Sequence, residues 1–312
     1  TVTLAMNGQS YTGTVNSGSA SIVVAAADLQ ALTEGSVAYT ADVSDSAGNT
    51  ATQHSGTFNY DASASIASSA FSFGAALNAT EDDGDATLTV ATADVDDGST
   101  VTLTLNGQSY TGAVSGDSAS IVVAAADLQA LTEGSVAYTA DVSDSAGNAA
   151  TQHNGSFTYD ATAPTISTSV FDFDAALNAT EDDGDATLTV TISGVEDGNT
   201  VTLAMNGQSY TGTVSSGSAS IVVAAADLQA LAEGTVAYTA DVSDSAGNAA
   251  AQHSGSFTYD ASASIASSGF DFGAALNATE GAGDATLRVA TAARGDGSTV
   301  TLTMNGQTCT GA

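Results

Sequence analysis

The sequence has 312 residues, of which 35 are acidic and only 2 are basic, so its formal net charge is −33. This charge argues against nucleic acid and anionic membrane surfaces as partners. The single cysteine, Cys309, excludes an internal disulfide, and no apolar run is long enough to span a membrane.

One block of sequence occurs three times. Ser19–Asn49 recurs letter for letter at Ser118–Asn148, and it recurs at Ser218–Asn248 with two changes. A spacing of about 100 residues is typical of one domain per repeat. Because the copies are nearly identical, we do not expect each to carry a different active site. The alignment predicts a partial repeat at 1–61, complete repeats at 62–160 and 161–260, and a partial repeat at 261–312, as in a window taken from a longer array.

Within the complete repeat at 161–260, apolar residues alternate with polar ones, which predicts short strands. Asn206-Gly207 lies between two such runs and predicts a tight hairpin. The stretch Ala225–Leu231 is the only helix-like piece and should form one or two turns. The predicted strands lie around Phe171–Phe173, Thr187–Ile192, Val201–Leu203, Tyr210–Val214, Ile221–Val223, Val236–Val242 and Phe257–Tyr259.

About seven short strands without a long helix predict an all-β fold, in which each repeat is an Ig-like antiparallel β-sandwich. The Cys–Trp–Cys signature of antibody domains is missing. The junctions between repeats are short, as at Asp160–Pro164, and contain no Gly/Ser-rich or Pro-rich spacer. We therefore expect the sandwiches to be arranged end to end.

Acidic residues recur in three loops of each repeat. In a seven-strand sandwich, the loop after the first strand should lie near the exit of the last strand, and the other two loops should lie at the opposite end. Two acidic ends would then meet at each junction and repel each other, unless Ca²⁺, which takes about 6–8 oxygen ligands, joined them. The alternative is that these residues only serve turn formation and face solvent. The predicted metal ligands are Asp61, Asp82, Asp83, Asp141, Asp144, Asn148, Asp160, Asp182, Asp183, Asp197, Asp241, Asp244 and Asn248.

Other polar residues give weaker signals. The histidine of each repeat, His153 in the first complete copy, has no cysteine or second histidine nearby in sequence, so we predict a surface strand residue and not a ligand. Tyr138 follows the inward alternation and should pack in the core. Asn178 begins an N-A-T sequon that we interpret as a loop. No nucleophile motif or Ser–His–Asp pattern is present, so we do not expect an enzyme.

The segments NGQSYTG, AADLQAL, VAYTADVSDSAGN and YDATAP resemble bacterial Ig-like repeats, the tandem extender modules of giant surface adhesins, including the repeats-in-toxin type. The resemblance covers every complete repeat. It implies export, a cell-surface location and stiffening by Ca²⁺ near junctions. The implied ligands are Asp160 with Asp241, Asp244 and Asn248, and Asp61 with Asp141, Asp144 and Asn148. The sequence departs from the family pattern in two ways: only one junction contains proline, and the glycine-rich calcium nonapeptides are absent.

The sequence thus predicts an extracellular, calcium-stiffened stalk that projects a binding domain from a bacterial surface for adhesion or biofilm formation. Its partners would be neighbouring repeats of the same chain. Two alternatives stay open: a subunit of an extracellular filament completed by strand exchange between chains, and a repeated glycan-binding module. Glycan sites need solvent-facing aromatic rings. Here the Tyr and Phe residues fall at inward positions, which favours the stalk.

Overall fold

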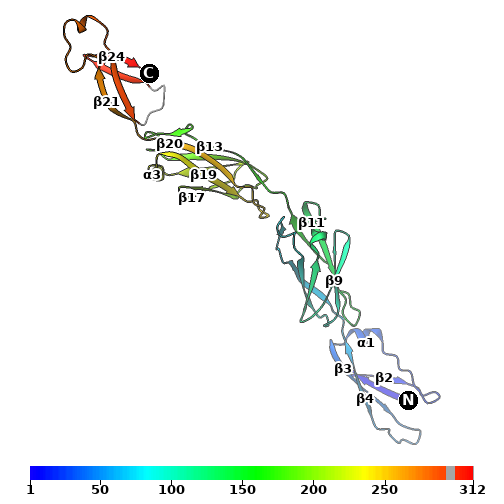
Figure 1. Cartoon of the computed structure of the whole chain (residues 1–312). Helices are drawn as coiled ribbons and strands as arrows, with labels where there is room; N and C mark the ends of the chain where they lie inside the picture. Colours follow the sequence, from blue (N-terminus) through cyan, green and yellow to red (C-terminus); the bar gives the residue numbers. More distant parts are fainter. Residues whose placement is uncertain (293–298, 312) are drawn as a thin grey trace. The chain divides into compact units, whose positions relative to one another are not determined.

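The computed structural model describes residues 1–292 and 299–311. The chain divides into two compact units, Thr1–Asp160 and Ala161–Ala312, and each is described by itself. Strands dominate both units (Figure 1). Within the described ranges, the helices are α1 (Ala26–Gln30), α2 (Ala125–Leu128), α3 (Ala225–Leu228) and the 3-10 turn Glu280–Ala282.

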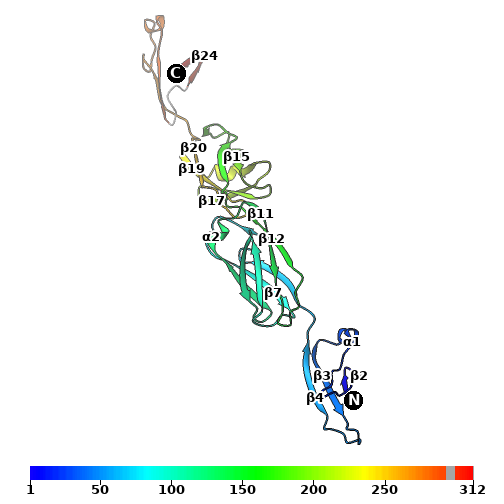
Figure 2. The same cartoon turned by 90° about the vertical axis from the view of Figure 1, so that its right-hand side faces the viewer.

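The complete repeat of the first unit is a two-layer sandwich. A three-stranded sheet with the order β10-β7-β5 faces a five-stranded sheet with the order β6-β12-β11-β8-β9 (Figure 2). The pairs are antiparallel, except that β6 pairs with β12 in parallel. The strands are β5 (Ser65–Phe71), β6 (Ala76–Leu77), β7 (Ala86–Ala93), β8 (Thr100–Leu105), β9 (Gln108–Ala113), β10 (Ser118–Val123), β11 (Gly134–Asp141) and β12 (His153–Tyr159).

The core of this repeat lies between the two sheets. Successive side chains of a strand point to opposite faces, and every second residue of β7 is buried. Leu88 of β7, Leu103 of β8 and Ile121 of β10 are each 0% exposed. The Phe71 ring packs edge-on against Tyr138, with their centroids 5.2 Å apart. The inward alternation of Tyr138 is therefore confirmed.

The two sheets also approach each other closely along one edge, where β9 meets β10. A Cβ placed on Gly112 would lie 2.5 Å from the carbonyl oxygen of Ser120 and 2.9 Å from Cγ1 of Ile121. Only a residue without a side chain allows the two strands to come this close.

The partial repeat of the same unit forms one sheet with the order β2-β1-β3-β4. Its strands are β1 (Val2–Met6), β2 (Gln9–Gly13), β3 (Gly35–Val43) and β4 (His54–Tyr60). The segment 19–24 is not a strand here, although the same residues form β10 in the complete repeat.

The second unit repeats this architecture. Its sheets have the orders β13-β15-β18 and β14-β20-β19-β16-β17, followed by the two-stranded sheets β21-β22 and β23-β24. The strands are β13 (Thr165–Phe171), β14 (Ala176–Leu177), β15 (Ala186–Ser193), β16 (Thr200–Met205), β17 (Gln208–Thr213), β18 (Ser218–Val223), β19 (Gly234–Val242), β20 (His253–Tyr259), β21 (Ser264–Phe270), β22 (Leu287–Ala292), β23 (Val300–Met304) and β24 (Gln307–Gly311).

The predicted all-β, Ig-like fold is confirmed, and so is the hairpin at Asn206-Gly207, where both residues have positive φ. The helix-like stretch forms one turn, α3. Two details differ from the prediction. Each complete repeat has eight strands, because the two-residue β6 and β14 form separately from β5 and β13, and their pairing with the last strand is parallel.

Candidate functional site

The first acidic loop, residues 78–85, lies beside the end of β12, as the strand order predicts. The backbone N–H of Asp160 donates to the carbonyl of Leu77 at 3.0 Å. The Tyr159 hydroxyl donates to Oδ2 of Asp82 at 2.6 Å, and both side chains are 5% exposed. Asp82, a predicted metal ligand, is therefore a buried hydrogen-bond acceptor for the last strand.

Two residues of this loop close it on itself. Oδ1 of Asn78 accepts hydrogen bonds from the N–H groups of Thr80 and Glu81 at 2.9 and 3.0 Å, while Oε2 of Glu81 accepts one from the N–H of Asn78 at 3.2 Å. This reciprocal arrangement is a capping box. The N-A-T-E segment is thus explained by turn chemistry, as the loop interpretation of the sequon predicts.

The other two carboxylates of the loop point to the α2 region. Oδ1 of Asp85 accepts from the N–H of Ala125 at 3.0 Å, which satisfies a free donor at the start of α2. Oδ1 of Asp83 accepts from Nε2 of Gln129 at 3.0 Å. The second complete repeat has the same contacts, in the pairs Asp182–Tyr259, Asp183–Gln229 and Asp185–Ala225.

At the opposite end of the repeat, Asp144 organises its own loop. Its Oδ1 accepts the N–H groups of Gly147 and Asn148, both at 2.8 Å, and its Oδ2 accepts Nδ2 of Asn148 at 2.7 Å. Burial raises the pKa of the Asp144 carboxyl, but the hydrogen bonds from Asn148 and Gly147 outweigh it, so the pKa lies below its ordinary value. The predicted ligands Asp144 and Asn148 are thus each other's partners, as are Asp244 and Asn248.

The second acidic loop lies at this same end of the repeat, as the second complete repeat shows. Glu196 accepts the N–H of Ser245 at 2.9 Å, and Asp197 accepts the N–H of Ser216 at 2.7 Å. The structure therefore brings the second and third acidic loops together, as predicted. In the first complete repeat, Asp96 likewise accepts the backbone N–H of Ser145, at 3.2 Å.

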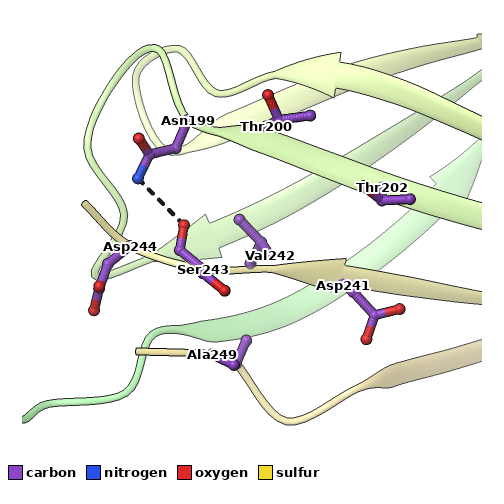
Figure 3. A pocket seen from close by; sticks show the side chains of 9 residues that line it. Asn199, Thr200, Thr202, Asp241, Val242, Ser243, Asp244 and Ala249 are labelled. Carbon is purple, nitrogen blue, oxygen red and sulfur yellow. Dashed lines mark hydrogen bonds between the residues drawn. The ribbon is translucent and has the colours of Figure 1, made fainter. Parts of the chain in front are cut away.

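A pocket opens at this end of the second complete repeat (Figure 3). In it, Nδ2 of Asn199 donates to the carbonyl of Ser243 at 3.2 Å. The carboxylates of Asp241 and Asp244 do not point toward each other (Figure 3), and both oxygens of Asp241 accept Nε2 of Gln252 at 3.1 Å. The pocket is lined by Asn199, Thr200, Thr202, Asp241, Val242, Ser243, Asp244, Ala249 and Ala250.

Carboxylate and amide oxygens suit Ca²⁺ chemically. In the part of the chain that the structure describes, however, no three His, Cys, Asp or Glu side chains form a group that could hold a metal ion. The carboxylates of Asp82, Asp83, Asp141 and Asp144 serve side-chain or backbone donors of their own repeat. Asp61 accepts the N–H of Ser63 at 3.4 Å. The ligand set therefore stays a prediction, and it is not a preformed cluster inside one repeat.

The sequence did not reveal a cluster that joins the two sheets. Oγ of Ser69 on β5 lies 2.8 Å from the hydroxyl of Tyr138 and 2.9 Å from Nε2 of His153. The second complete repeat has the same cluster at Ser169, Tyr238 and His253. The predicted strand position of His153 is confirmed, since it is the first residue of β12, but its side chain is partly buried and meets Ser69. All three residues occur at the same positions in both complete repeats, and this recurrence could have indicated a shared role. They are far apart in sequence, so the sequence alone did not show that they are in contact.

No protein-family model matches the sequence, and no curated protein matches it. Solved structures do. A solved chain from work on a 1.5-MDa bacterial ice-binding adhesin is 30% identical to this one; the match covers 84% of this chain and 86% of that solved chain, with a TM-score of 0.41. A solved chain of a Ca²⁺-stabilized adhesin that helps an Antarctic bacterium reach out and bind ice is 33% identical to this one; the match covers 99% of this chain and 78% of that solved chain, with a TM-score of 0.40.

An immunoglobulin-like domain from the M. primoryensis ice-binding adhesin is 34% identical over 31% of this chain and 96% of its own, with a TM-score of 0.24. The relation to the first two adhesins rests on sequence identity of 30% and 33% over most of this chain, and not on the TM-scores. Residues 1–292 and 299–311 contain no helix with the length and apolar character needed to cross a membrane.

Proposed function

We propose that this chain is a segment of the stalk of a bacterial surface adhesin, since it belongs to the tandem Ig-like repeats of giant bacterial adhesins. The stalk would lie outside the cell and project a binding domain away from the surface. Its role would be structural and not enzymatic, and its partners would be the neighbouring repeats of the same chain.

The observation that best supports this proposal is the equivalence of the two complete repeats. Each has the same sheet orders, the same buried Tyr–Asp hydrogen bond and the same self-closed Asp–Asn loop. Units that differ so little are suited to adding length. A row of different binding or catalytic sites would require side chains that differ between the repeats.

Small-angle scattering on the whole chain tests the stalk. Strands rise about 3.3 Å per residue, so each complete repeat with its loops should add roughly 30–40 Å of length. We expect an extended particle whose maximum dimension grows by this amount when one more repeat is included. A compact particle, or a length that does not grow with repeat number, would contradict the proposal.

We also propose that Ca²⁺ stabilises the array. The net charge of −33 leaves the folded chain almost without internal counter-charge, and one of the similar proteins is described as Ca²⁺-stabilized. The ligands would be the carboxylates near the ends of each repeat, those predicted from the sequence. Ca²⁺ would supply positive charge there, while the hydrogen bonds of each loop position the carboxylates.

The test of calcium must separate binding from charge screening, because any salt weakens repulsion between exposed carboxylates. Thermal unfolding is therefore measured with millimolar Ca²⁺ and with chelator at one fixed ionic strength. We expect a higher Tm with Ca²⁺ because a ligand of the folded state stabilises it by mass action. The matched variants are Asp160→Ala and Asp244→Ala, which should reduce the gain. An unchanged Tm would rule out specific calcium binding.

A further inference from the structure

The strands that carry the two ends of a complete repeat lie side by side. The chain enters the repeat through β5, and β6 is the next strand. The chain leaves the repeat after β12, its last strand. Ala76 and Leu77 of β6 pair in parallel with Thr158 and Tyr159 of β12. The N–H of Thr158 donates to the carbonyl of Ala75 at 3.0 Å. This short pair therefore joins the incoming strand directly to the outgoing one.

Tension on the chain would load this pair in a particular direction. A pull on both ends of the repeat draws β5 and β6 along their axis one way and β12 the opposite way. The hydrogen bonds between strands run across that axis. They would therefore be sheared together, and not opened one after another from an end.

A buried side-chain hydrogen bond strengthens the same place. Tyr159 is the last residue of β12, and its hydroxyl donates to Asp82 at 2.6 Å. A hydrogen bond with an ionised acceptor is of the stronger kind. Asp82 belongs to the loop that the Asn78–Glu81 capping box closes. The end of β12 is thus hydrogen-bonded to a loop that is itself held by the capping box.

The second complete repeat has the same arrangement. Ala176 and Leu177 of β14 pair in parallel with Thr258 and Tyr259 of β20, and the Tyr259 hydroxyl donates to Asp182 at 2.6 Å. The device is therefore a property of the repeat and not of one copy.

We propose that the β6–β12 pair and the Tyr159–Asp82 hydrogen bond form a mechanical clamp, the contact that must break before a repeat unfolds under tension. Its use in the cell rests on the proposed stalk function. The second complete repeat has its own clamp, formed by β14, β20 and the Tyr259–Asp182 hydrogen bond.

The same domain offers a matched control. Tyr110 of β9 lies close to the carboxylate of Asp127 of α2. Burial, together with Asp127, raises the pKa of Tyr110 to about 12, and Asp82 together with burial does the same for Tyr159. Both tyrosines lie beside a carboxylate, but along the chain neither β9 nor α2 adjoins the start or the finish of the repeat. Tyr110→Phe therefore removes a hydroxyl beside a carboxylate without touching the β6–β12 pair.

The experiment is constant-force unfolding of the whole chain, held by its two ends. In Tyr159→Phe, the repeat at 62–160 should unfold about ten- to a hundredfold faster at a given force, because the lost bond is broken in the transition state. The unchanged repeat at 161–260 provides the reference event in the same molecule. In Tyr110→Phe, the unfolding rate under force should not change, and chemical denaturation of both variants measures how far each lowers equilibrium stability.

A second variant, Asp82→Asn, keeps one acceptor oxygen and removes its charge, so it should accelerate unfolding under force, but less than Tyr159→Phe does. It keeps the proposal testable if Tyr159→Phe folds poorly. Equal acceleration in the Tyr110 and Tyr159 variants would overturn the proposal, as would no acceleration in either clamp variant. Neither result would bear on the stalk itself, which the scattering experiment tests independently.

Discussion

The partial repeat at 1–61 and the complete repeat at 62–160 share an identical block of sequence that folds differently in the two. In the complete repeat, residues 118–123 form β10 and pair with β7, whereas residues 19–24 form no strand. Leu128 of α2 is 0% exposed, while its counterpart Leu29 is 39% exposed. Residues 1–61 contain no equivalent of β5, β6 and β7. A strand of this kind therefore depends on its partner and not on its own residues.

Other parts of the block fold alike in both places. β3 and β11 pair with their neighbours in the same register. Asp45 accepts the N–H and the Nδ2 of Asn49 at 2.9 and 2.8 Å, as Asp144 does with Asn148. Hairpins and self-closed loops are thus local, whereas burial of α2 and formation of β10 need the second layer.

The largest effect should come from removing a core residue of that second layer. Leu88→Ala leaves a cavity in β7, the partner of β10, and should destabilise the repeat at 62–160 by about 2–5 kcal/mol. Chemical denaturation of the whole chain should then show an earlier transition for this repeat, while the repeat at 161–260 keeps its own. Thr89→Ala, at the exposed neighbouring position, is the control. Equal effects at both positions would contradict the assigned core.

A smaller loss should follow from forcing apart the edge where β9 meets β10. In Gly112→Ala, the new Cβ would collide with the backbone oxygen of Ser120, and overpacking of this kind costs about 1–3 kcal/mol. Gly84→Ala in the same repeat is the control, because the nearest atom to its Cβ would be 4.0 Å away. The comparison is made by thermal unfolding. A harmless Gly112→Ala variant would show that the edge is not closed.

Two tyrosines of the complete repeat should titrate late at high pH. Tyr159 and Tyr110 have pKa values of about 12, above the ordinary value of 10. A raised pKa means that the folded state holds the proton more tightly. The stabilisation is therefore full below pH 10 and is lost as the pH rises toward 12. Ultraviolet titration should show late-titrating tyrosines that Tyr159→Phe and Tyr110→Phe each reduce. Titration near pH 10 in the folded chain would contradict both contacts.

The smallest effect should come from the aspartate that closes its own loop, which the partial and the complete repeat share. The lowered pKa of Asp45 and Asp144 means that stability is present above the ordinary pKa, near 4, and is lost as the pH falls through the lower folded value. Asp45→Ala and Asp144→Ala should each loosen only their own loop, which NMR can follow residue by residue. Asp144→Asn retains one acceptor oxygen and should do less harm. Different behaviour of the two aspartates would show that the loop is not local.

Much of the fold could be predicted because its signals are local. Alternation located the strands, Asn206-Gly207 located a hairpin, and strand order placed the acidic loops at the two ends of the repeat. The roles of the carboxylates could not be predicted, because they depend on contacts between distant residues. Asp82 meets Tyr159 and His153 meets Ser69 only after the sheets pack. A run of acidic residues in sequence does not reveal which donors will face it.

The central claim is that the β5–β7 layer causes residues 118–123 to form a strand while the identical residues 19–24 do not. Amide hydrogen exchange in these two segments tests this claim most directly. NMR would follow the amides of Ile22 and Val24 and those of Ile121 and Val123 in one sample. The β10 amides that bond to β7 should exchange only through opening of the repeat, whereas their counterparts at 19–24 should exchange orders of magnitude faster. Equal protection of the two segments would show that the strand forms without its partner.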